Sequence, residues 1–75
     1  MNFDPATIKA GDWLVPDPVW NRTAGRGAEL PIPVEVAVAF RSASQTGVVF
    51  TVKSTFGHWM ELDAGWFTDK VEPPK

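Results

Sequence analysis

The 75-residue sequence contains no cysteine and no tyrosine. Without cysteine, neither a disulfide framework nor a thiolate metal site can stabilise the fold, so a hydrophobic core must do so alone. No apolar run approaches the roughly 18 residues that a membrane-spanning helix needs. The N-terminal residues also lack the basic and apolar regions of a secretory leader. We therefore expect a cytoplasmic protein with no membrane association.

The sequence also has no run of like charge. Nine acidic and seven basic residues are spread along the chain and give a net charge of −2. Phosphate-binding proteins usually cluster lysine and arginine, and the nearest approach to such a cluster is the pair Arg22 and Arg26. The charge pattern therefore does not favour a nucleic acid as partner.

Residues that carry catalysis are scarce as well. His58 is the only histidine, whereas a catalytic zinc site usually needs about three protein ligands. As a general base, His58 would need an orienting acid and a nucleophile, and no spacing in the sequence supplies them. The sequence predicts no catalytic residue, no metal and no cofactor. The sequon Asn21-Arg22-Thr23 is interpreted as a chance match.

What the sequence does contain is enough apolar material for one domain over residues 1–75. Hydrophobic residues make up 44% of the chain and include four tryptophans and five phenylalanines. Short segments of alternating apolar and polar residues, separated by turn signals, are typical of a small all-β domain. The predicted strands cover 13–15, 34–41, 48–53 and 58–62, followed by a short last strand that contains Phe67 and Val71.

Three of these strands carry an expectation about which side chains face the core. The core-facing residues are predicted to be Val34, Val36, Val38, Phe40, Val48, Phe50, Val52, Met60 and Leu62. Turns are expected at 4–7, 8–12, 41–47 and 54–57, with Gly47 supplying a positive φ. The tail 73–75 is expected to fray.

Residues 16–33 are predicted to form one long loop, because they are rich in proline and glycine and poor in apolar residues. Trp20 lies inside this segment. Two interpretations stay open: Trp20 folds back to close one end of the domain, or it is a contact residue on a mobile arm.

Trp59 and Trp66 are predicted to point outward, where they could meet on one surface. Large apolar groups on an outer face often mark an interface, and tryptophan is enriched among residues that dominate binding. The alternative is that the N-terminal segment or the long loop covers them. The predicted binding residues are Trp20, Trp59 and Trp66 as anchors, with Arg22, Arg41 and His58 as a polar rim.

The predicted elements come in the order strand, long loop, three-stranded meander, short turn and last strand, with Gly11-Asp12 at the front and Gly65-Trp66-Phe67 near the end. This arrangement resembles SH3-like barrels. The resemblance implies a five-stranded barrel that binds other molecules. Signalling SH3 domains hold proline-rich peptides in a tyrosine-lined groove, which a chain without tyrosine lacks.

The sequence thus predicts a non-enzymatic interaction module that binds a protein partner or its own copies, of the kind found among bacterial and phage accessory proteins. Two other functions stay open. One is a single-stranded nucleic-acid binder that stacks bases on Trp59 and Trp66. The other is an enzyme whose active site forms between subunits.

Overall fold

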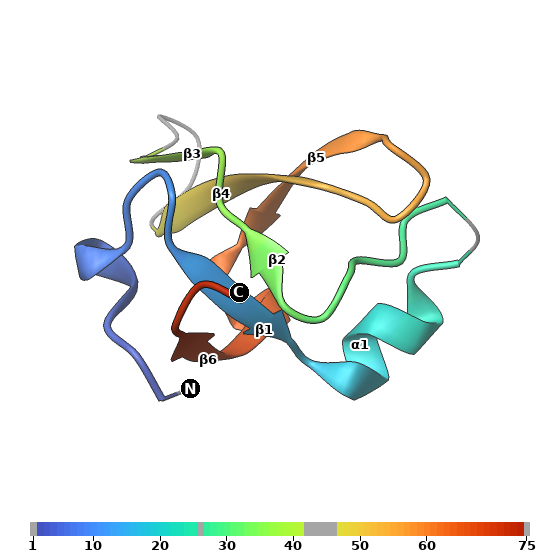
Figure 1. The fold of residues 1–75 in the computed structure, drawn as a ribbon, viewed down its shortest axis with the longest axis horizontal. Coiled ribbons are helices and arrows are strands. Elements are labelled where there is room, and N and C mark those ends of the chain that lie inside the picture. The colour runs from blue at the N-terminus through green and yellow to red at the C-terminus, as the bar shows by residue number, and fades with distance from the viewer. Residues whose placement is uncertain (1, 26, 42–46, 75) are drawn as a thin grey trace.

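The structure is a computed structural model that describes residues 2–25, 27–41 and 47–74. Its short segments follow one another along the chain as shown in Figure 1. They are η1 (Pro5–Thr7), β1 (Trp13–Pro16), α1 (Pro18–Thr23), β2 (Val34–Glu35), β3 (Val38–Arg41), β4 (Val48–Lys53), β5 (Trp59–Asp63), η2 (Ala64–Trp66) and β6 (Phe67–Val71).

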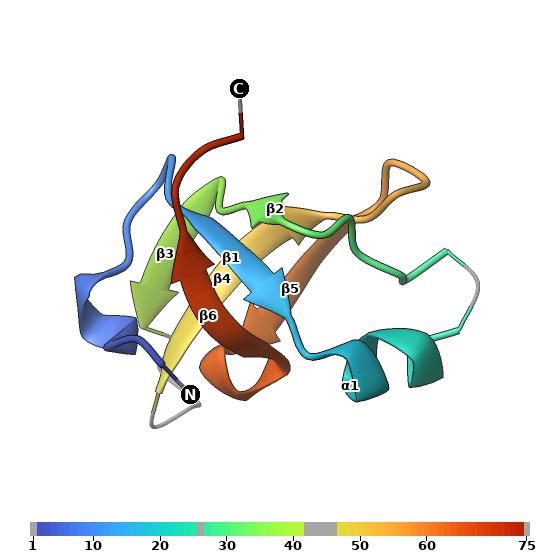
Figure 2. The same cartoon turned by 60° about the horizontal axis from the view of Figure 1, so that its bottom comes forward.

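The six strands form two antiparallel sheets. One sheet has the order β2-β1-β6 and the other the order β3-β4-β5, and Figure 2 shows β1 and β6 in front of β4 and β5. The prediction of a β domain is therefore confirmed. The closed five-stranded barrel is not what the structure shows, because the segment predicted as one strand over 34–41 is divided between the two sheets.

That division takes place between two consecutive residues. The N–H of Val36 donates to the carbonyl of Asp12 at 2.8 Å, beside the first sheet, and the N–H of Ala37 donates to the carbonyl of Thr51 at 2.8 Å, in the second sheet. The chain bends at Ala37 as it changes partners. Residues 34–41 therefore run continuously from one sheet into the other.

The bend also changes which side chains face the core. Val34 and Val36 are buried as predicted, but Ala39 packs against the core after the bend, while Val38 is 49% exposed. Phe40 is half-buried, outside the core cluster. The prediction that Val38 and Phe40 belong to the core is wrong, because a shift of one residue in a strand moves every side chain to the other face.

The core lies between the two sheets. Phe50 of β4 and Phe67 of β6 meet edge to face there, with ring centroids 5.7 Å apart and ring planes at 68°. The predicted strand 48–53 is confirmed, with Phe50 and Val52 buried and Val48 packed against the core. The buried cluster comprises Ile8, Leu14, Leu30, Val34, Val36, Phe50, Val52, Ala64 and Phe67, with Met60 and Leu62 packed against it.

Residues 16–33 are not one uniform loop, because they contain α1. Pro18 is in the first turn of this helix, where its missing N–H costs nothing, and Asp17 caps it. Pro16 ends β1 opposite Phe67. Pro16 therefore ends the strand and Pro18 begins the helix.

The turns follow the predictions with one exception. Asp4 caps η1, and residues 54–58 form the turn between β4 and β5. Gly47 has no positive φ, whereas Gly11, Gly25, Gly27 and Gly57 do. The rest of the predicted turn, 42–46, lies outside the described residues, as do Arg26 and the last residue of the predicted tail. Within the described ranges, no helix is both long and apolar enough to cross a membrane.

Candidate interaction sites

Trp20 and Trp66 form the first candidate site, where α1 meets η2. Their ring centroids are 6.1 Å apart with the planes inclined at 34°. Trp20 is 57% exposed and the neighbouring Val19 is 61% exposed, whereas Trp66 is half-buried against the core. We call Val19, Trp20 and Trp66 the tryptophan patch.

Asp17 positions this patch. Its carboxylate accepts hydrogen bonds from the backbone N–H groups of Val19 and Trp20, at 2.9 and 3.3 Å. Its own N–H donates to the carbonyl of Trp66 at 2.7 Å. One aspartate therefore fixes the start of α1 and ties it to η2, which brings the two tryptophans together.

Asn21 fixes the other side of α1. It is 3% exposed, its side-chain amide donates to the carbonyl of Leu30 at 3.0 Å, and its side-chain oxygen accepts from the N–H of Leu30 at 2.8 Å. This pair of bonds, here called the Asn21 clamp, imitates one rung of a β-ladder. The side chain is buried and hydrogen-bonded through both its nitrogen and its oxygen, which gives this asparagine a structural role and leaves its amide inaccessible for glycosylation in the folded protein.

The indole nitrogen of Trp66 has an unusual environment. Its N–H is buried and has no hydrogen-bond partner among the described residues. An unsatisfied buried donor costs about 1–3 kcal/mol. The patch therefore contains a buried donor, and a hydrogen bond from this donor to an acceptor would stabilise the protein.

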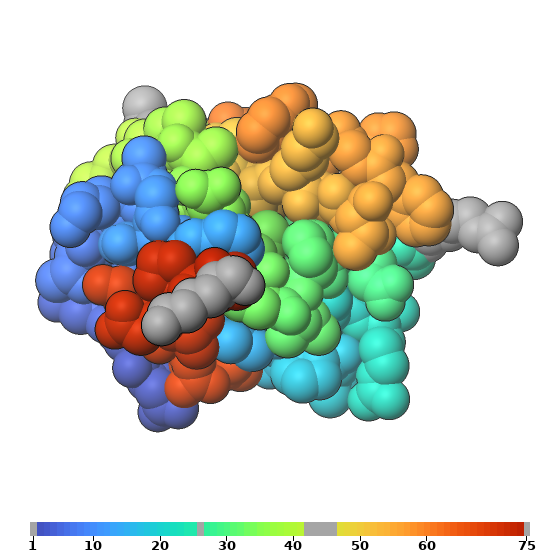
Figure 3. Space-filling model, in the orientation of Figure 1, coloured from blue at the N-terminus to red at the C-terminus, as the bar shows by residue number. Residues whose placement is uncertain are grey.

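The second candidate site is a groove of about 530 Å³ to which both sheets contribute. Figure 3 shows the residues 31–35 region of the surface beside that of the 54–58 turn, on the face toward the viewer. The groove is lined by Trp13, Pro31, Pro33, Val34, Glu35, Ala37, Lys53, Ser54, Thr55 and Trp59. We call it the Trp13–Trp59 groove.

Trp59 is the most accessible aromatic group of this groove, at 62% exposed. The ammonium of Lys53 lies 5.5 Å from the centroid of its ring, and the two residues are directly opposite each other in the β4–β5 ladder. Such a cation–π contact contributes about 0.5–1 kcal/mol at an exposed site. Trp59 is thus already oriented to receive a positive charge.

The turn before β5 holds Trp59 in place. Ser54 is buried, its N–H donates to the carbonyl of His58 at 2.8 Å, and its hydroxyl accepts from the N–H of His58 at 3.1 Å. Gly57 closes the turn by donating to the carbonyl of Ser54 at 3.0 Å. The groove therefore depends on backbone geometry as much as on side chains.

The predicted site residues do not form one surface. Trp59 begins β5, whereas Trp66 follows its far end in η2, so the predicted meeting of Trp59 and Trp66 is wrong: Trp66 contacts Trp20 instead. Trp20 does not close one end of the domain, because it is 57% exposed, and it is not on a free arm, because it contacts Trp66. Arg41 is exposed at the end of β3.

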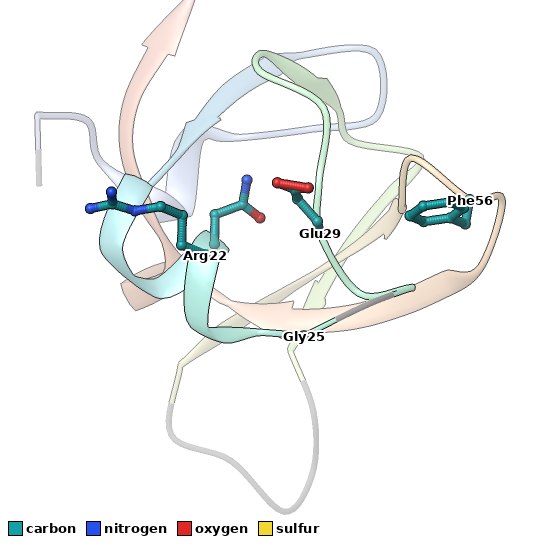
Figure 4. A pocket seen from close by; sticks show the side chains of 5 residues that line it. Arg22, Gly25, Glu29 and Phe56 are labelled. Carbon is teal, nitrogen blue, oxygen red and sulfur yellow. The ribbon is translucent and has the colours of Figure 1, made fainter.

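Arg22 and His58 also lie apart from a common rim. Arg22 lines a separate pocket of about 320 Å³ with Asn21, Gly25, Glu29 and Phe56, and Figure 4 shows its guanidinium directed away from the Glu29 carboxylate. His58 is exposed beside the long loop, since a Cβ added at Gly27 would come 3.6 Å from its ring. Among the described residues, neither side chain forms a hydrogen bond or an ion pair with the tryptophan patch.

Sequence reasoning missed three residues that the sites depend on: Trp13, Lys53 and Asn21. Trp13 alternates with the buried Leu14, which was a signal that its ring faces outward. Lys53 sits at the end of a clear strand, but its partner became evident only from the ladder register. The partner of Asn21 is nine residues away, and nothing in the local sequence pointed to it.

Comparison with known proteins adds no assignment, because no protein family, no curated protein and no solved structure matches this chain. Among the described residues, no group of three or more histidine, aspartate or glutamate side chains is arranged to hold a metal ion. The candidate sites therefore rest on aromatic surface and hydrogen-bonding groups.

Proposed function

We propose that this protein is an interaction module that binds a partner protein through the tryptophan patch. The observation that carries the proposal is Trp20, a tryptophan more than half exposed on a helix whose position is fixed by Asp17 and the Asn21 clamp. Tryptophan is enriched among residues that dominate protein–protein binding. A pre-positioned side chain also loses little conformational freedom when it binds.

The chemistry of the patch indicates what the partner supplies. An apolar side chain would pack on Trp20 and Val19, and a carbonyl oxygen would accept the indole N–H of Trp66, which has no partner among the described residues. Because this N–H is buried, an acceptor reaches it only when a neighbouring side chain moves on binding. Binding would then remove an unfavourable feature of the free protein.

The order of the elements supports a distant SH3-like relationship as part of this proposal. A long first connection, a three-stranded meander and a short turn before the last strand come in the order predicted from the sequence. That scaffold mostly serves binding, but fold alone does not define function. The proposal therefore depends on the patch.

A displayed library of random peptides, selected on the wild-type protein, tests the proposal. We expect enriched peptides whose affinity falls about 30-fold or more for Trp20→Ala, the loss that corresponds to a binding hot spot. Trp59→Ala is the matched control, since it removes an equally exposed indole from the other site. Equal binding by wild type and Trp20→Ala would contradict the proposal.

Two measurements identify the competing functions. Light scattering after size exclusion would reveal an oligomer, and an oligomer that dissociates in Trp20→Ala would assign the patch to self-association or to a site between subunits. Binding of a single-stranded oligonucleotide that weakens steeply with salt would indicate nucleic acid instead. The exposed acidic residues Glu35 and Glu61 near Trp59 disfavour a nucleic acid as the partner.

A further inference from the structure

The Trp13–Trp59 groove has a chemistry different from that of the tryptophan patch. It receives one indole from each sheet, since Trp13 begins β1 and Trp59 begins β5. The rest of the lining combines four apolar residues with four polar ones, namely Pro31, Pro33, Val34, Ala37, Glu35, Lys53, Ser54 and Thr55. A groove that offers two indoles and a carboxylate suits a group that is both apolar and positively charged.

One positively charged side chain of the protein itself, Lys53, already lines the groove. The Lys53 ammonium lies 5.5 Å from the centroid of the Trp59 ring. Indole rings attract cations because their faces carry negative charge density, and organic cations exploit this most fully because they are weakly hydrated. Lys53 therefore marks a position where a positive charge is stabilised.

Glu35 supplies the negative charge that such a ligand needs. It is directly opposite Trp13 in the β1–β2 ladder, and residues directly opposite in antiparallel strands place their side chains on the same face. Glu35 is exposed and forms no ion pair with any described residue. One carboxylate thus borders the groove next to one of its two indoles.

We propose that the Trp13–Trp59 groove binds an organic cation, an alkylated ammonium or a guanidinium, with its charge against Trp59 and Glu35. The incoming cation takes the place of the Lys53 ammonium, so Lys53 acts as an internal competitor that weakens binding. This site is separate from the tryptophan patch and does not depend on the function proposed for it.

The test follows the four indole N–H signals by NMR, assigned with single Trp→Phe variants, while a cation is added. The probes are tetramethylammonium chloride and N-acetyl-arginine amide, with sodium chloride at equal ionic strength as the control. We expect the Trp13 and Trp59 signals to shift with at least one organic cation, while those of Trp20 and Trp66 stay unchanged. Shifts that sodium chloride reproduces, or no shift with either probe, would overturn the proposal.

The two probes distinguish the source of the cation. A response to tetramethylammonium alone indicates a free quaternary ammonium compound, and a response to the arginine derivative alone indicates a side chain of a protein partner. A response to both supports the shared cation chemistry. Because the readout is specific to each tryptophan, failure here leaves the peptide selection on Trp20 unaffected.

Three variants test the assigned roles. Lys53→Met keeps the length of the side chain but removes its charge, and we expect it to tighten binding about two- to fivefold. Glu35→Gln and Trp59→Ala should each weaken binding by a similar factor, and Trp20→Ala should leave it unchanged. All four positions are exposed, so circular dichroism should show a native fold. Weaker binding by Lys53→Met would refute the role of Lys53 as competitor.

Discussion

The tryptophan patch and the Trp13–Trp59 groove both present a tryptophan that is more than half exposed, but they are held in place in different ways. Trp20 stands on a six-residue helix that is too short to be stable by itself. Its position depends on the side chains of Asp17 and Asn21. Trp13 and Trp59 begin strands whose backbones are hydrogen-bonded along ladders.

This difference shows that the patch depends on the hydrogen bonds of two side chains, whereas the groove also depends on backbone ladders. The two regions meet at residues 29 and 30. The carbonyl of Glu29 accepts the N–H and the hydroxyl of Thr55, at 2.9 and 3.1 Å, and the adjacent Leu30 takes part in the Asn21 clamp. We therefore expect a mutation on one side of this junction to perturb its own region more than the other region.

Removing the Asn21 clamp should produce the largest effect. Asn21→Leu eliminates both hydrogen bonds and leaves the N–H and carbonyl of the buried Leu30 without partners. We expect a loss of about 2–4 kcal/mol in the free energy of unfolding. A domain of this size has about 3–5 kcal/mol in total, so the variant should be only marginally folded. Urea unfolding followed by tryptophan fluorescence measures the loss.

The exposed neighbour Arg22 provides the control for this experiment. Arg22→Ala should change the free energy of unfolding by no more than about 0.5 kcal/mol, as is usual for surface positions. In the folded fraction of the Asn21→Leu protein, the indole N–H signals of Trp20 and Trp66 should shift more than those of Trp13 and Trp59. A loss below 1 kcal/mol, or equal movement of all four signals, would mean that the clamp does not hold the patch.

The groove should respond to a change in the turn before β5. Gly57 has a φ of 88°, and a side chain in this left-handed region costs about 1–2 kcal/mol. Gly57→Ala should lower the free energy of unfolding by about this amount. It should also shift the indole N–H signal of Trp59 more than that of Trp20. The same urea and NMR measurements detect both effects.

Gly47→Ala is the matched control, because Gly47 has no positive φ and no atom within 4 Å of an added Cβ. It should be neutral or should stabilise the protein by up to about 1 kcal/mol, since alanine restricts the unfolded chain. Equal destabilisation by the two substitutions would show that the φ of Gly57 is not what determines the cost.

The comparison also explains how far the sequence could predict this molecule. The bounds of β4 were predicted correctly, because Val48, Phe50 and Val52 alternate along it and all its pairing is within one sheet, although Val49 is buried as well. The division of 34–41 could not be predicted, because it depends on carbonyls of Asp12 and Thr51 that are distant in sequence. Local alternation continues through Ala37 even though the backbone bends there.

The candidate sites were predictable to the same limited extent. Alternation predicted Trp59 and Trp66 to point outward and left the position of Trp20 open. Trp20 and Trp59 are more than half exposed, whereas Trp66 is half-buried against the core. Their grouping was not predictable, since the contact between Trp20 and Trp66 requires both the helix inside 16–33 and the 3-10 turn after β5. Lys53 and Glu35 gained significance only from the ladder registers that place them beside Trp59 and Trp13.

The smallest expected effect concerns a position outside both sites, where the N-terminal segment meets β6. The side-chain amide of Asn2 donates to the Asp69 carboxylate at 2.8 Å, and the Thr68 hydroxyl donates to it at 3.0 Å. These two bonds lower the pKa of Asp69 below its usual value of 3.8, with Asn2 the larger cause. A lowered pKa in the folded state means that the carboxylate stabilises the protein above pH 3.8, and that this stabilisation is lost as the pH falls below it.

Asn2→Ala should therefore flatten the dependence of unfolding free energy on pH below about pH 4, where a carboxylate of ordinary pKa titrates alike in both states. Urea unfolding at a series of pH values measures this slope, and Asp69→Asn, which cannot titrate, gives the limit that Asn2→Ala should approach. All four indole signals should keep their positions at neutral pH. An unchanged slope would show that the Asn2 bond does not perturb Asp69, whereas a shifted indole would show that the N-terminal segment, too, helps to hold one of the two tryptophan sites.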